Sequence, residues 1–278
     1  MGEPIAIVSP KPQTTRTRIL GVLNRPEGQV AFVDTPGIHA SKGALNRYMV
    51  DVALAALSEV DLVLYLVEAK AAKVASVDEG NRFILERLTQ RKRPAILALN
   101  KVDAIAKPLL LPLIDLYRRE YEFQEIVPIS AKTGEGVEDL LGVVLSHLPE
   151  GTLLFPSETI TDQTERTLVA EYVREQVLQH TRQELPYSTA VVVDVFDESD
   201  RHTGRKGLIR IAATIYVERE SQKAIVIGKR GQMLKTIGQA ARMQSEKMLG
   251  AHVYLSLRVK VERDWTERAD GLKKMGYA

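Results

Sequence analysis

The stretch Pro94–Asp103 reads PAILALNKVD and decides the fold of the first half of the chain. Five consecutive apolar residues, Ala95–Leu99, run directly into the polar sequence NKVD. An apolar run of this length predicts a strand that is buried on both faces, as in a parallel sheet covered by helices. Polar residues directly after such a strand lie at the carboxyl edge of the sheet, where open α/β folds bind their ligands.

The same alternation continues on both sides of this stretch. Further short apolar runs predict strands at 30–34, 61–68 and 126–129, and helical periodicity lies between them at 45–59, 78–90, 109–120 and 137–148. Strands that alternate with helices indicate a mostly parallel sheet with both faces covered. We therefore predict an α/β domain over residues 1–150.

A second domain is expected after a linker. Residues 151–164 combine Gly, Pro, hydroxyl and acidic residues, which is typical of a linker. Residues 165–278 then predict a small α+β domain. Its expected elements are an amphipathic helix at 165–182, strands at 190–196 and 208–217, a short strand at Ile225–Ile227, a helix at 232–249 and a strand at 253–261.

Composition narrows the class of protein. The 278 residues are 45% hydrophobic and 27% charged, which is ordinary for a globular protein, and no apolar run reaches the ~18 residues of a membrane span. The absence of cysteine excludes disulfides and thiolate metal sites, and it fits a reducing, cytoplasmic setting.

Charge is distributed unevenly along the chain. Residues 201–278 carry 17 Lys and Arg against 7 Asp and Glu, a net charge of +10, whereas residues 1–200 carry a net charge of −8. A basic end on an acidic body indicates a polyanionic partner at that end. A well-solvated basic face is the alternative.

The sequence Asn100-Lys101-Val102-Asp103 offers the chemistry of a guanine site. A carboxylate at Asp103 can accept two parallel hydrogen bonds, from N1–H and the exocyclic amine of guanine, and adenine offers no such pair. Asn100 can join neighbouring loops, and the Lys101 stem can lie over the base. A plain polar loop at the end of a strand is the alternative.

The sequence Asp34-Thr35-Pro36-Gly37, followed by Ile38, also comes directly after an apolar run. In phosphoryl-transfer sites an Asp in this place holds Mg²⁺, and a following Gly amide reaches the γ-phosphate. Thr14 and Thr15 lie where a first switch would be, and one of their hydroxyls could complete the Mg²⁺ shell. Thr14, Thr15 and Gly37 are thus the switch candidates, although a Pro-Gly turn is common without any such role.

A third triplet, Ser130-Ala131-Lys132, follows the strand predicted at 126–129, where a backbone amide could meet guanine O6. Alone it carries little information. In this order, each after a predicted strand, the three motifs resemble the guanine-nucleotide-binding motifs of the translation-factor-related GTPases.

Such a domain uses a phosphate-binding loop, G-x-x-x-x-G-K-S/T, whose amides and Lys hold the phosphates. No run of this form occurs in the sequence, and SPKPQTTRTR at 9–18 leads directly into the switch threonines. We expect that the sequence begins beyond the first strand, loop and helix, through a mis-assigned start or a truncation, and a real loss of the loop is the alternative. We also expect it to bind guanine nucleotide more weakly than an intact relative, and hydrolysis by this chain stays an open question.

The sequence Gly228-Lys229-Arg230-Gly231 is the main motif of the second domain. Two glycines let the backbone approach a nucleic-acid strand, and the basic pair between them can meet phosphates. The motif lies between apolar elements in the basic part of the chain and resembles the G-x-x-G loop of KH domains. An apolar groove beside Ile225, Ile227 and Ile237 is expected to select bases. A helix-capping turn is the alternative.

Together, SPKPQTTR, DTPG, NKVD, SAK, the linker ending in ITD, ELPYS at 184–188 and VIGKRG resemble the Era family of bacterial GTPases over essentially the whole chain. The resemblance implies a P-loop-NTPase-like G domain and a type II KH domain, with GTP, GDP and Mg²⁺ as ligands. It further implies binding to the 3′ end of small-subunit (16S) ribosomal RNA during small-subunit assembly and rRNA maturation. A cytoplasmic monomer with some peripheral association at the inner face of the cell membrane is also implied.

Two other functions remain compatible with these motifs. One is an RNA-binding KH protein with a relic G domain and no hydrolysis, against which the intact DTPG and NKVD argue. The other is a two-domain GTPase acting on transfer RNA, against which the G-x-x-G domain argues.

Overall fold

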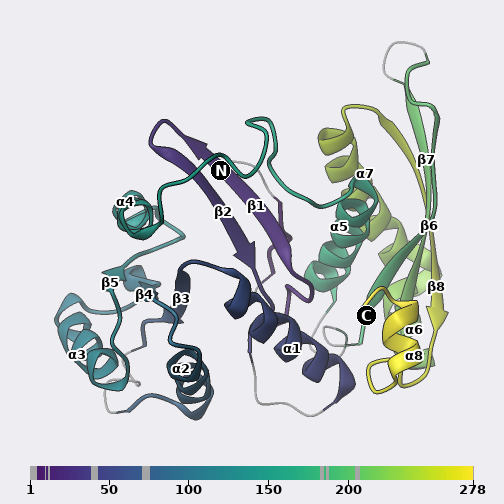
Figure 1. Cartoon of the computed structure of the whole chain (residues 1–278). Coiled ribbons are helices and arrows are strands. Elements are labelled where there is room, and N and C mark those ends of the chain that lie inside the picture. The colour runs from purple at the N-terminus through teal and green to yellow at the C-terminus, as the bar shows by residue number, and fades with distance from the viewer. Residues whose placement is uncertain are drawn as a thin grey trace.

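The computed structural model describes residues 5–9, 11, 13–38, 43–70, 76–181, 185, 188–203 and 207–277. Figure 1 shows two bodies side by side, an N-terminal α/β body and a C-terminal body built around one sheet. A strand hairpin and helix α1 (Ala44–Glu59) lie between them. This division agrees in outline with the predicted order of domains, although the bounds 1–150, 151–164 and 165–278 stay a prediction.

The N-terminal body contains the predicted parallel sheet. Its strands lie in the order β3–β4–β5, and all neighbours are parallel. Glu68 is in register with Asn100, and Leu99 with Pro128, so the three strands end at one edge. The strands are β3 (Val63–Glu68), β4 (Ala95–Asn100) and β5 (Glu125–Pro128).

Helices cover both faces of this sheet, as the unbroken apolar runs predict. On one face the core joins strand residues such as Leu97 and Leu99 to α2 and α3. On the other face Ile96 and Ala98 pack against α4 and the hairpin. The helices are α2 (Glu79–Arg91), α3 (Leu110–Glu120) and α4 (Val137–His147), with short 3-10 turns at Val102–Ala104 and Lys107–Leu109.

The sequence analysis missed strand β1 (Ile19–Arg25), which pairs antiparallel with β2 (Gly28–Asp34). The described strands of this body therefore form two sheets, and its pairing is mixed rather than parallel throughout. Two residues, Pro26 and Glu27, connect the strands. The signal was present, because an apolar run followed by a short Pro-Gly-bounded turn is typical of a hairpin.

The predicted linker is not a free connection between the two domains, because it lies along β1 and is hydrogen-bonded to it. Val22 N–H donates to Ile160 O at 2.8 Å, and the Thr161 hydroxyl donates to Leu20 O at 2.7 Å. Gln29 donates to Phe155 O at 2.9 Å. The linker is thus hydrogen-bonded to the hairpin along much of its length.

The C-terminal body has the element order helix–strand–strand–helix–helix–strand–helix. Strands β6 and β7 are antiparallel, β7 and β8 are parallel, and three helices cover one face of the sheet. The elements are α5 (Glu165–His180), β6 (Ala190–Asp200), β7 (Leu208–Val217), α6 (Glu220–Ile227), a 3-10 turn at Lys229–Gly231, α7 (Gln232–Leu249), β8 (His252–Val261) and α8 (Ala269–Lys274). Helices α6 and α8 were not predicted.

The strand predicted at Ile225–Ile227 is wrong, because these residues form the last turn of α6. Their β-branched side chains favour strands, but Val226 is fully buried in the core with α7, and burial outweighs propensity. The start of the helix is stabilised by Gln222, whose side-chain oxygen accepts from Glu218 N and Arg219 N at 2.9 and 3.1 Å.

Helix α5 was expected to be amphipathic and is not. Seven consecutive residues, Tyr172–Leu178, are buried, and they include Arg174, Glu175 and Gln176. One side of the helix packs on the sheet and α7, and the side that would otherwise face solvent is covered by the N-terminal segment around Ile7. Helical periodicity reports only residues within the helix, so it cannot predict contacts from a segment about 165 residues away in sequence.

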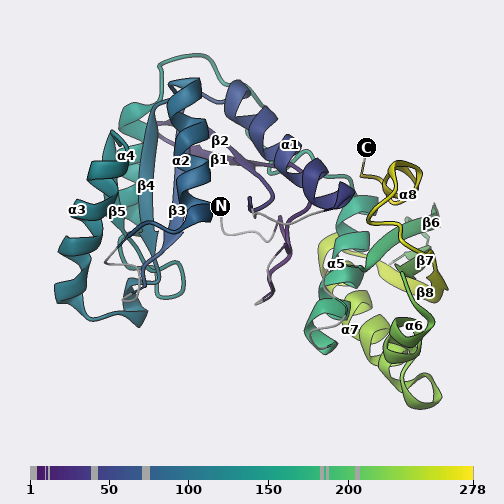
Figure 2. The same ribbon diagram turned by 90° about the horizontal axis from the view of Figure 1, so that it is seen from below.

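The two bodies share one apolar cluster. Leu45 and Met49, near the start of α1, pack with Trp265, Met275 and other C-terminal residues, and Leu45 N–H donates to Thr266 O at 2.8 Å. Figure 2 shows α1 reaching from the α/β body to the C-terminal body. The two bodies are therefore joined by a buried core in addition to the linker.

Candidate functional site

The NKVD loop leaves the carboxyl end of β4 through a left-handed residue, Lys101, with φ of 67°. Asn100 Oδ1 accepts from Lys101 N–H at 2.7 Å and from Ala131 N–H at 3.0 Å. This side chain joins the loop after β4 to the loop after β5. The donor in this second contact is therefore a backbone amide of the Ser130–Lys132 triplet, one of whose amides is expected to meet guanine O6.

Asp103 and Ser130 form a second link between the two loops. The Ser130 hydroxyl donates to Asp103 Oδ1 at 2.7 Å and accepts from Thr133 N–H at 3.2 Å. Ser130 is fully buried, whereas Asp103 is exposed, so the buried hydroxyl orients a carboxylate that faces outward. Lys101 Nζ lies 3.2 Å from Glu68 Oε1 at the end of β3.

Asp34 and Thr15 form a separate pair at the end of β2. The Thr15 hydroxyl donates to Asp34 Oδ2 at 3.2 Å. Burial raises the pKa of the Asp34 carboxyl, and the hydrogen bonds from the Thr15 hydroxyl and the Thr35 N–H oppose this rise. The Thr14 hydroxyl donates to Lys11 O at 2.7 Å, so it is Thr15 that faces Asp34.

This pair fits a hard divalent cation in its donor chemistry. A carboxylate and a hydroxyl are oxygen ligands of the kind that Mg²⁺ takes, and Mg²⁺ usually binds through one or two protein ligands plus phosphates and water. The described residues contain no group of three or more acidic or His side chains that could hold a metal by themselves. After Asp34, Pro36 is buried and Gly37 is exposed.

Two groups of motif residues result. One joins Asn100, Asp103, Ser130 and Ala131, with Lys132 exposed beside them, and the other joins Asp34 and Thr15. No hydrogen bond or ion pair connects the two groups within the described ranges. Strand-end geometry explains the first group, because β4 and β5 are parallel neighbours.

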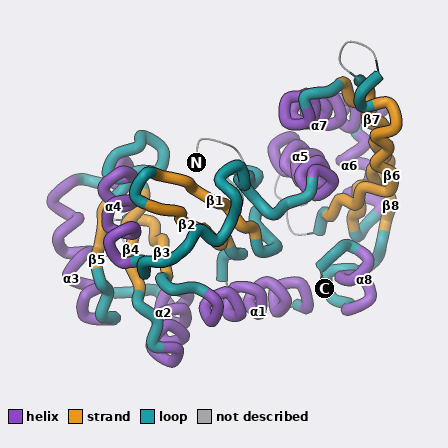
Figure 3. The backbone as a smooth tube through the Cα atoms, turned by 45° about the horizontal axis from the view of Figure 1, so that its top comes forward, coloured by secondary structure: helices purple, strands orange, loops and turns teal. Residues whose placement is uncertain are grey.

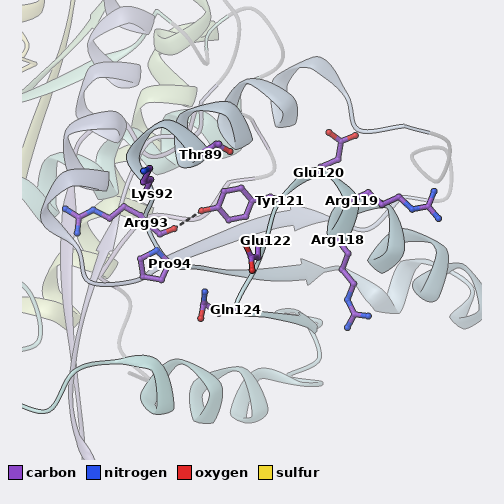
Figure 4. Close-up of a pocket in the computed structure, with 10 residues that line it drawn as sticks. All are labelled: Thr89, Lys92, Arg93, Pro94, Arg118, Arg119, Glu120, Tyr121, Glu122 and Gln124. Carbon is purple, nitrogen blue, oxygen red and sulfur yellow. Dashed lines mark hydrogen bonds between the residues drawn. The ribbon is translucent and has the colours of Figure 1, made fainter.

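One hollow on the surface of the N-terminal body lies away from both groups. It measures about 670 Å³ and is located at the amino ends of β4 and β5 (Figure 4). Figure 4 shows Tyr121 directed at Arg93, and its hydroxyl donates to Arg93 O at 2.7 Å. Ligands of parallel sheets bind at the opposite edge, so we assign this hollow no nucleotide role.

The GKRG loop connects α6 to α7 with an unusual backbone. Gly228, Arg230 and Gly231 have φ of 70°, 53° and 77°. Lys229 and Arg230 are exposed at the tip. A Cβ on Gly228 would lie 2.5 Å from Met233 Cβ, so the start of α7 leaves no room for a side chain there.

A groove of about 510 Å³ runs from this loop between α7 and β8. Figure 3 places α7 beside the sheet that ends in β8. Apolar residues form one part of the lining, and Lys235 and Arg242 contribute cations. The lining residues are Gly231, Leu234, Lys235, Gly238, Gln239, Arg242, Leu255 and Leu257.

The groove differs from the predicted one in its residues. Ile237 is fully buried in the core, so it does not line the groove, and Ile225 and Ile227 also lie outside the lining. Lys235, Gly238 and Arg242 were missed. Their spacing of three and four residues along a helix after G-x-x-G places them on one face, which is a signal that the sequence contains.

Comparison with known families assigns both halves of the chain. Residues 1–101 match the family described as 50S ribosome-binding GTPase, and residues 184–266 match the KH domain family. Most of ELPYS, at 184–188, lies outside the described residues.

Curated relatives are similar over the full chain. GTPase Era of Geobacter metallireducens is 50% identical over 277 residues, which cover 100% of this chain and 90% of that protein. GTPase Era of Heliobacterium modesticaldum is 44% identical over 277 residues with the same coverage.

Two solved structures are similar over the full chain as well. The crystal structure of Era in complex with MgGDPNP and nucleotides 1506–1542 of 16S ribosomal RNA is 39% identical and superposes with a TM-score of 0.93, covering 100% of this chain and 92% of that one. A variant of Aquifex aeolicus Era bound to GDP·AlF4⁻ is 39% identical and has a TM-score of 0.91 at the same coverage. The predicted fold, an α/β nucleotide-binding domain followed by a KH domain, is confirmed. Among the described residues, no helix has the length and apolar character needed to span a membrane.

Proposed function

Because the chain belongs to the Era family of GTPases, we propose that it binds guanine nucleotide at the carboxyl edge of β4 and β5 and RNA along α7. The RNA is the 3′ end of small-subunit ribosomal RNA, and the process is small-subunit assembly. The observation that carries the proposal is the pair of loops joined by the contacts Asn100–Ala131 and Asp103–Ser130. The same chain also contains a groove with basic residues in its KH domain.

Guanine selection is proposed to rest on Asp103. Its Oδ1 accepts from Ser130, which leaves Oδ2 and the remaining lone pair of Oδ1 as acceptors directed outward. A base that offers two adjacent donors can pair with these remaining acceptors. Adenine offers no such pair of donors, so the acceptors would stay unpaired. Asn100 keeps the loop of Ala131 and Lys132 beside the base.

Mg²⁺ is proposed to bind at Asp34 and Thr15, which supply two oxygen ligands 3.2 Å apart. When bound, the ion neutralises charge on the nucleotide phosphates. Thr15 is preferred to Thr14 because the Thr14 hydroxyl is already directed at Lys11 O. Gly37 is exposed, and its amide is proposed to meet the γ-phosphate.

RNA is proposed to follow the GKRG loop and the groove between α7 and β8. Lys229 and Arg230 would contact phosphates, while Leu234, Leu255 and Leu257 offer apolar surface to the bases. The Era protein that was solved in complex with MgGDPNP and nucleotides 1506–1542 of 16S ribosomal RNA superposes over the whole of this chain, which supports this assignment.

We also propose GTP hydrolysis, a monomeric state, and a cytoplasmic protein with peripheral association at the inner face of the membrane. Membership of the family is the support for these properties. The domain bounds 1–150, 151–164 and 165–278 belong to the same proposal.

Binding by the full chain tests the RNA half. A short RNA resembling the 3′ end of small-subunit ribosomal RNA should bind more tightly than a scrambled RNA at physiological salt. Changing Lys229 and Arg230 to Asp should weaken both. The matched control changes Arg118 and Arg119 on α3 to Asp, which alters total charge equally but lies away from the groove. Equal affinity for both RNAs, unaffected by the loop change, would reduce the domain to a basic face.

Nucleotide binding tests the other half. A fluorescent GDP analogue should bind in the presence of Mg²⁺ more weakly than it binds a relative with an intact phosphate-binding loop, and GTP but not ATP should displace it. RNA binding without any guanine-nucleotide binding would favour the alternative, an RNA-binding KH protein with a relic G domain.

A further inference from the structure

We propose that Arg16 is a positioning residue: docked in the C-terminal domain, it holds Thr15 against Asp34 and so couples the candidate Mg²⁺ site to the RNA-binding domain. Arg16 directly follows Thr14 and Thr15, the two switch candidates. The inference rests on the proposed nucleotide site, since it concerns how that site is assembled.

Arg16 is buried in the C-terminal domain although it precedes the first strand of the N-terminal body. Its side chain is 2% exposed, and Nη1 donates to Thr189 O at 2.7 Å. The Tyr277 hydroxyl lies 3.4 Å from the same nitrogen. The guanidinium carbon lies 5.9 Å from the Trp265 ring centroid and 5.8 Å from that of Tyr277, within the range of cation–π contacts.

Two stacked aromatic rings form the side of this pocket that belongs to the C-terminal domain. The Trp265 and Tyr277 rings stack with centroids 5.8 Å apart and an interplanar angle of 16°. Trp265 is fully buried, and its indole N–H donates to Ser188 O at 3.0 Å. A buried guanidinium requires compensation from such partners, so the pocket is selective for this side chain and not a passive surface.

The same domain holds the residue on the other side of Thr15. Arg174 of α5 donates to Thr14 O and is itself oriented by Glu171, whose Oε1 accepts from Arg174 Nε at 2.8 Å. The carbonyl of Thr14 and the side chain of Arg16 are therefore both fixed by the C-terminal domain. Thr15 lies between them, and its hydroxyl is the group that reaches Asp34.

A further contact connects this region to the helix that lines the RNA groove. Glu175 Oε1 accepts from Val8 N–H at 2.9 Å, and Glu175 Oε2 accepts from the Gln244 side chain of α7 at 2.6 Å. The N-terminal segment thus contacts α5 at several points, and α5 contacts α7. A continuous path of contacts therefore joins α7 to Thr15 through α5.

The test uses the full 278-residue chain and the change Arg16→Met, which keeps length and removes charge. The matched control is Arg18→Met, since Arg18 is half-exposed and its ion pair with Glu59 at 3.3 Å lies on the surface. Hydrogen exchange across residues 13–18 should accelerate by about tenfold or more in Arg16→Met. It should stay within about twofold of the wild type in Arg18→Met.

A second readout separates positioning from a merely structural role. The carboxyl resonance of Asp34, in a chain labelled at aspartate and held at fixed pH, should shift in Thr15→Val. Arg16→Met should produce the same shift, and the double variant should add nothing. The Asp34→Asn spectrum assigns the resonance.

Three results would overturn the proposal. They are an Asp34 resonance unchanged by Arg16→Met, full additivity in the double variant, or faster exchange with a lower urea midpoint but no effect at Asp34. None of these readouts requires nucleotide. If the chain binds no GDP analogue, the proposed function fails, while the resonance still decides the role of Arg16.

Discussion

The buried hydroxyl of Ser130 donates a 2.7 Å hydrogen bond to Oδ1 of the exposed Asp103, 27 residues earlier in the chain. One residue therefore fixes the orientation of the carboxylate that we propose for base selection. The two residues come from loops after neighbouring parallel strands, β4 and β5, and their contact depends on the pairing of those strands.

In a chain extended at its N-terminus to carry a phosphate-binding loop, Asp103→Asn should shift nucleotide preference from guanine toward xanthine. Asn can still accept from Ser130 through its amide oxygen, and its amide nitrogen then faces the base as a donor. The expected change in the GTP-to-XTP affinity ratio is about tenfold to a hundredfold. Competition of GTP and XTP against a fluorescent GDP analogue measures it, with Asp115→Asn on the exposed side of α3 as the control. An unchanged ratio would remove Asp103 from its proposed role.

Ser130→Ala should weaken both stability and base recognition. The change removes the donor to Asp103 and the acceptor for Thr133 N–H, and it leaves a fully buried position without its polar group. Losing such contacts costs about 1–3 kcal/mol of unfolding free energy. Urea unfolding measures this cost, and Ser146→Ala, at an exposed site on α4, should change the midpoint little.

Gly228→Ala and Gly231→Ala should differ although both glycines have positive φ. Backbone strain of about 1 kcal/mol or more is expected in both, and it is larger at Gly228, whose φ of 70° and ψ of 176° lie in a region essentially limited to glycine, than at Gly231, with φ of 77° and ψ of 6°. Gly228→Ala adds a collision, because the new Cβ would lie 2.5 Å from Met233 Cβ, whereas nothing lies within 4 Å of the Cβ at Gly231. Urea midpoints should therefore fall further for Gly228→Ala. Equal decreases in the urea midpoint would show that Met233, at the start of α7, shifts without cost to make room for the new Cβ.

Acid should weaken the attachment of α8 through Glu262. The hydrogen bond from Lys274 lowers the pKa of the Glu262 carboxyl, and Arg268 donates to the same carboxylate at 2.8 Å. A carboxyl with a lowered folded-state pKa stabilises the protein above its unfolded pKa, and this stabilisation is lost as pH falls through the folded value. The contribution of such a surface network is about 0.5–1 kcal/mol.

The change Glu262→Gln tests this expectation in urea unfolding at pH 7 and at pH 3. The variant should be less stable than the wild type at pH 7, and the difference should shrink at pH 3, because the wild-type carboxyl gains protons as pH falls toward its lowered pKa. A difference that is constant with pH would assign the effect to packing instead of charge.

Much of the fold follows from local pattern. Ala95–Leu99 predicts a doubly covered parallel strand because only side chains buried on both faces are continuously apolar. Strand-end position then predicts that Asn100 and Ser130 lie close together, and the structure joins their loops. Glycine spacing at 228–231 predicts much of the loop conformation, since two of the three positions with positive φ there are glycines.

Local pattern fails where distant segments supply the burial. Ile225–Ile227 form a helix because Val226 packs against α7, which outweighs the strand propensity of β-branched residues. Thr14 and Thr15 are equivalent in sequence, and only the contacts of their hydroxyls, with Lys11 O and Asp34 respectively, separate them.

The sequence by itself determined the two-domain order, the parallel sheet and the identity of the motif residues, because apolar periodicity and glycine placement act within a few residues. Only the tertiary structure decided that Arg16, a charged residue in an extended polar segment, lies buried beside the stacked rings of Trp265 and Tyr277. Burial of a cation depends on partners about 250 residues away, and no local pattern encodes where those partners fold.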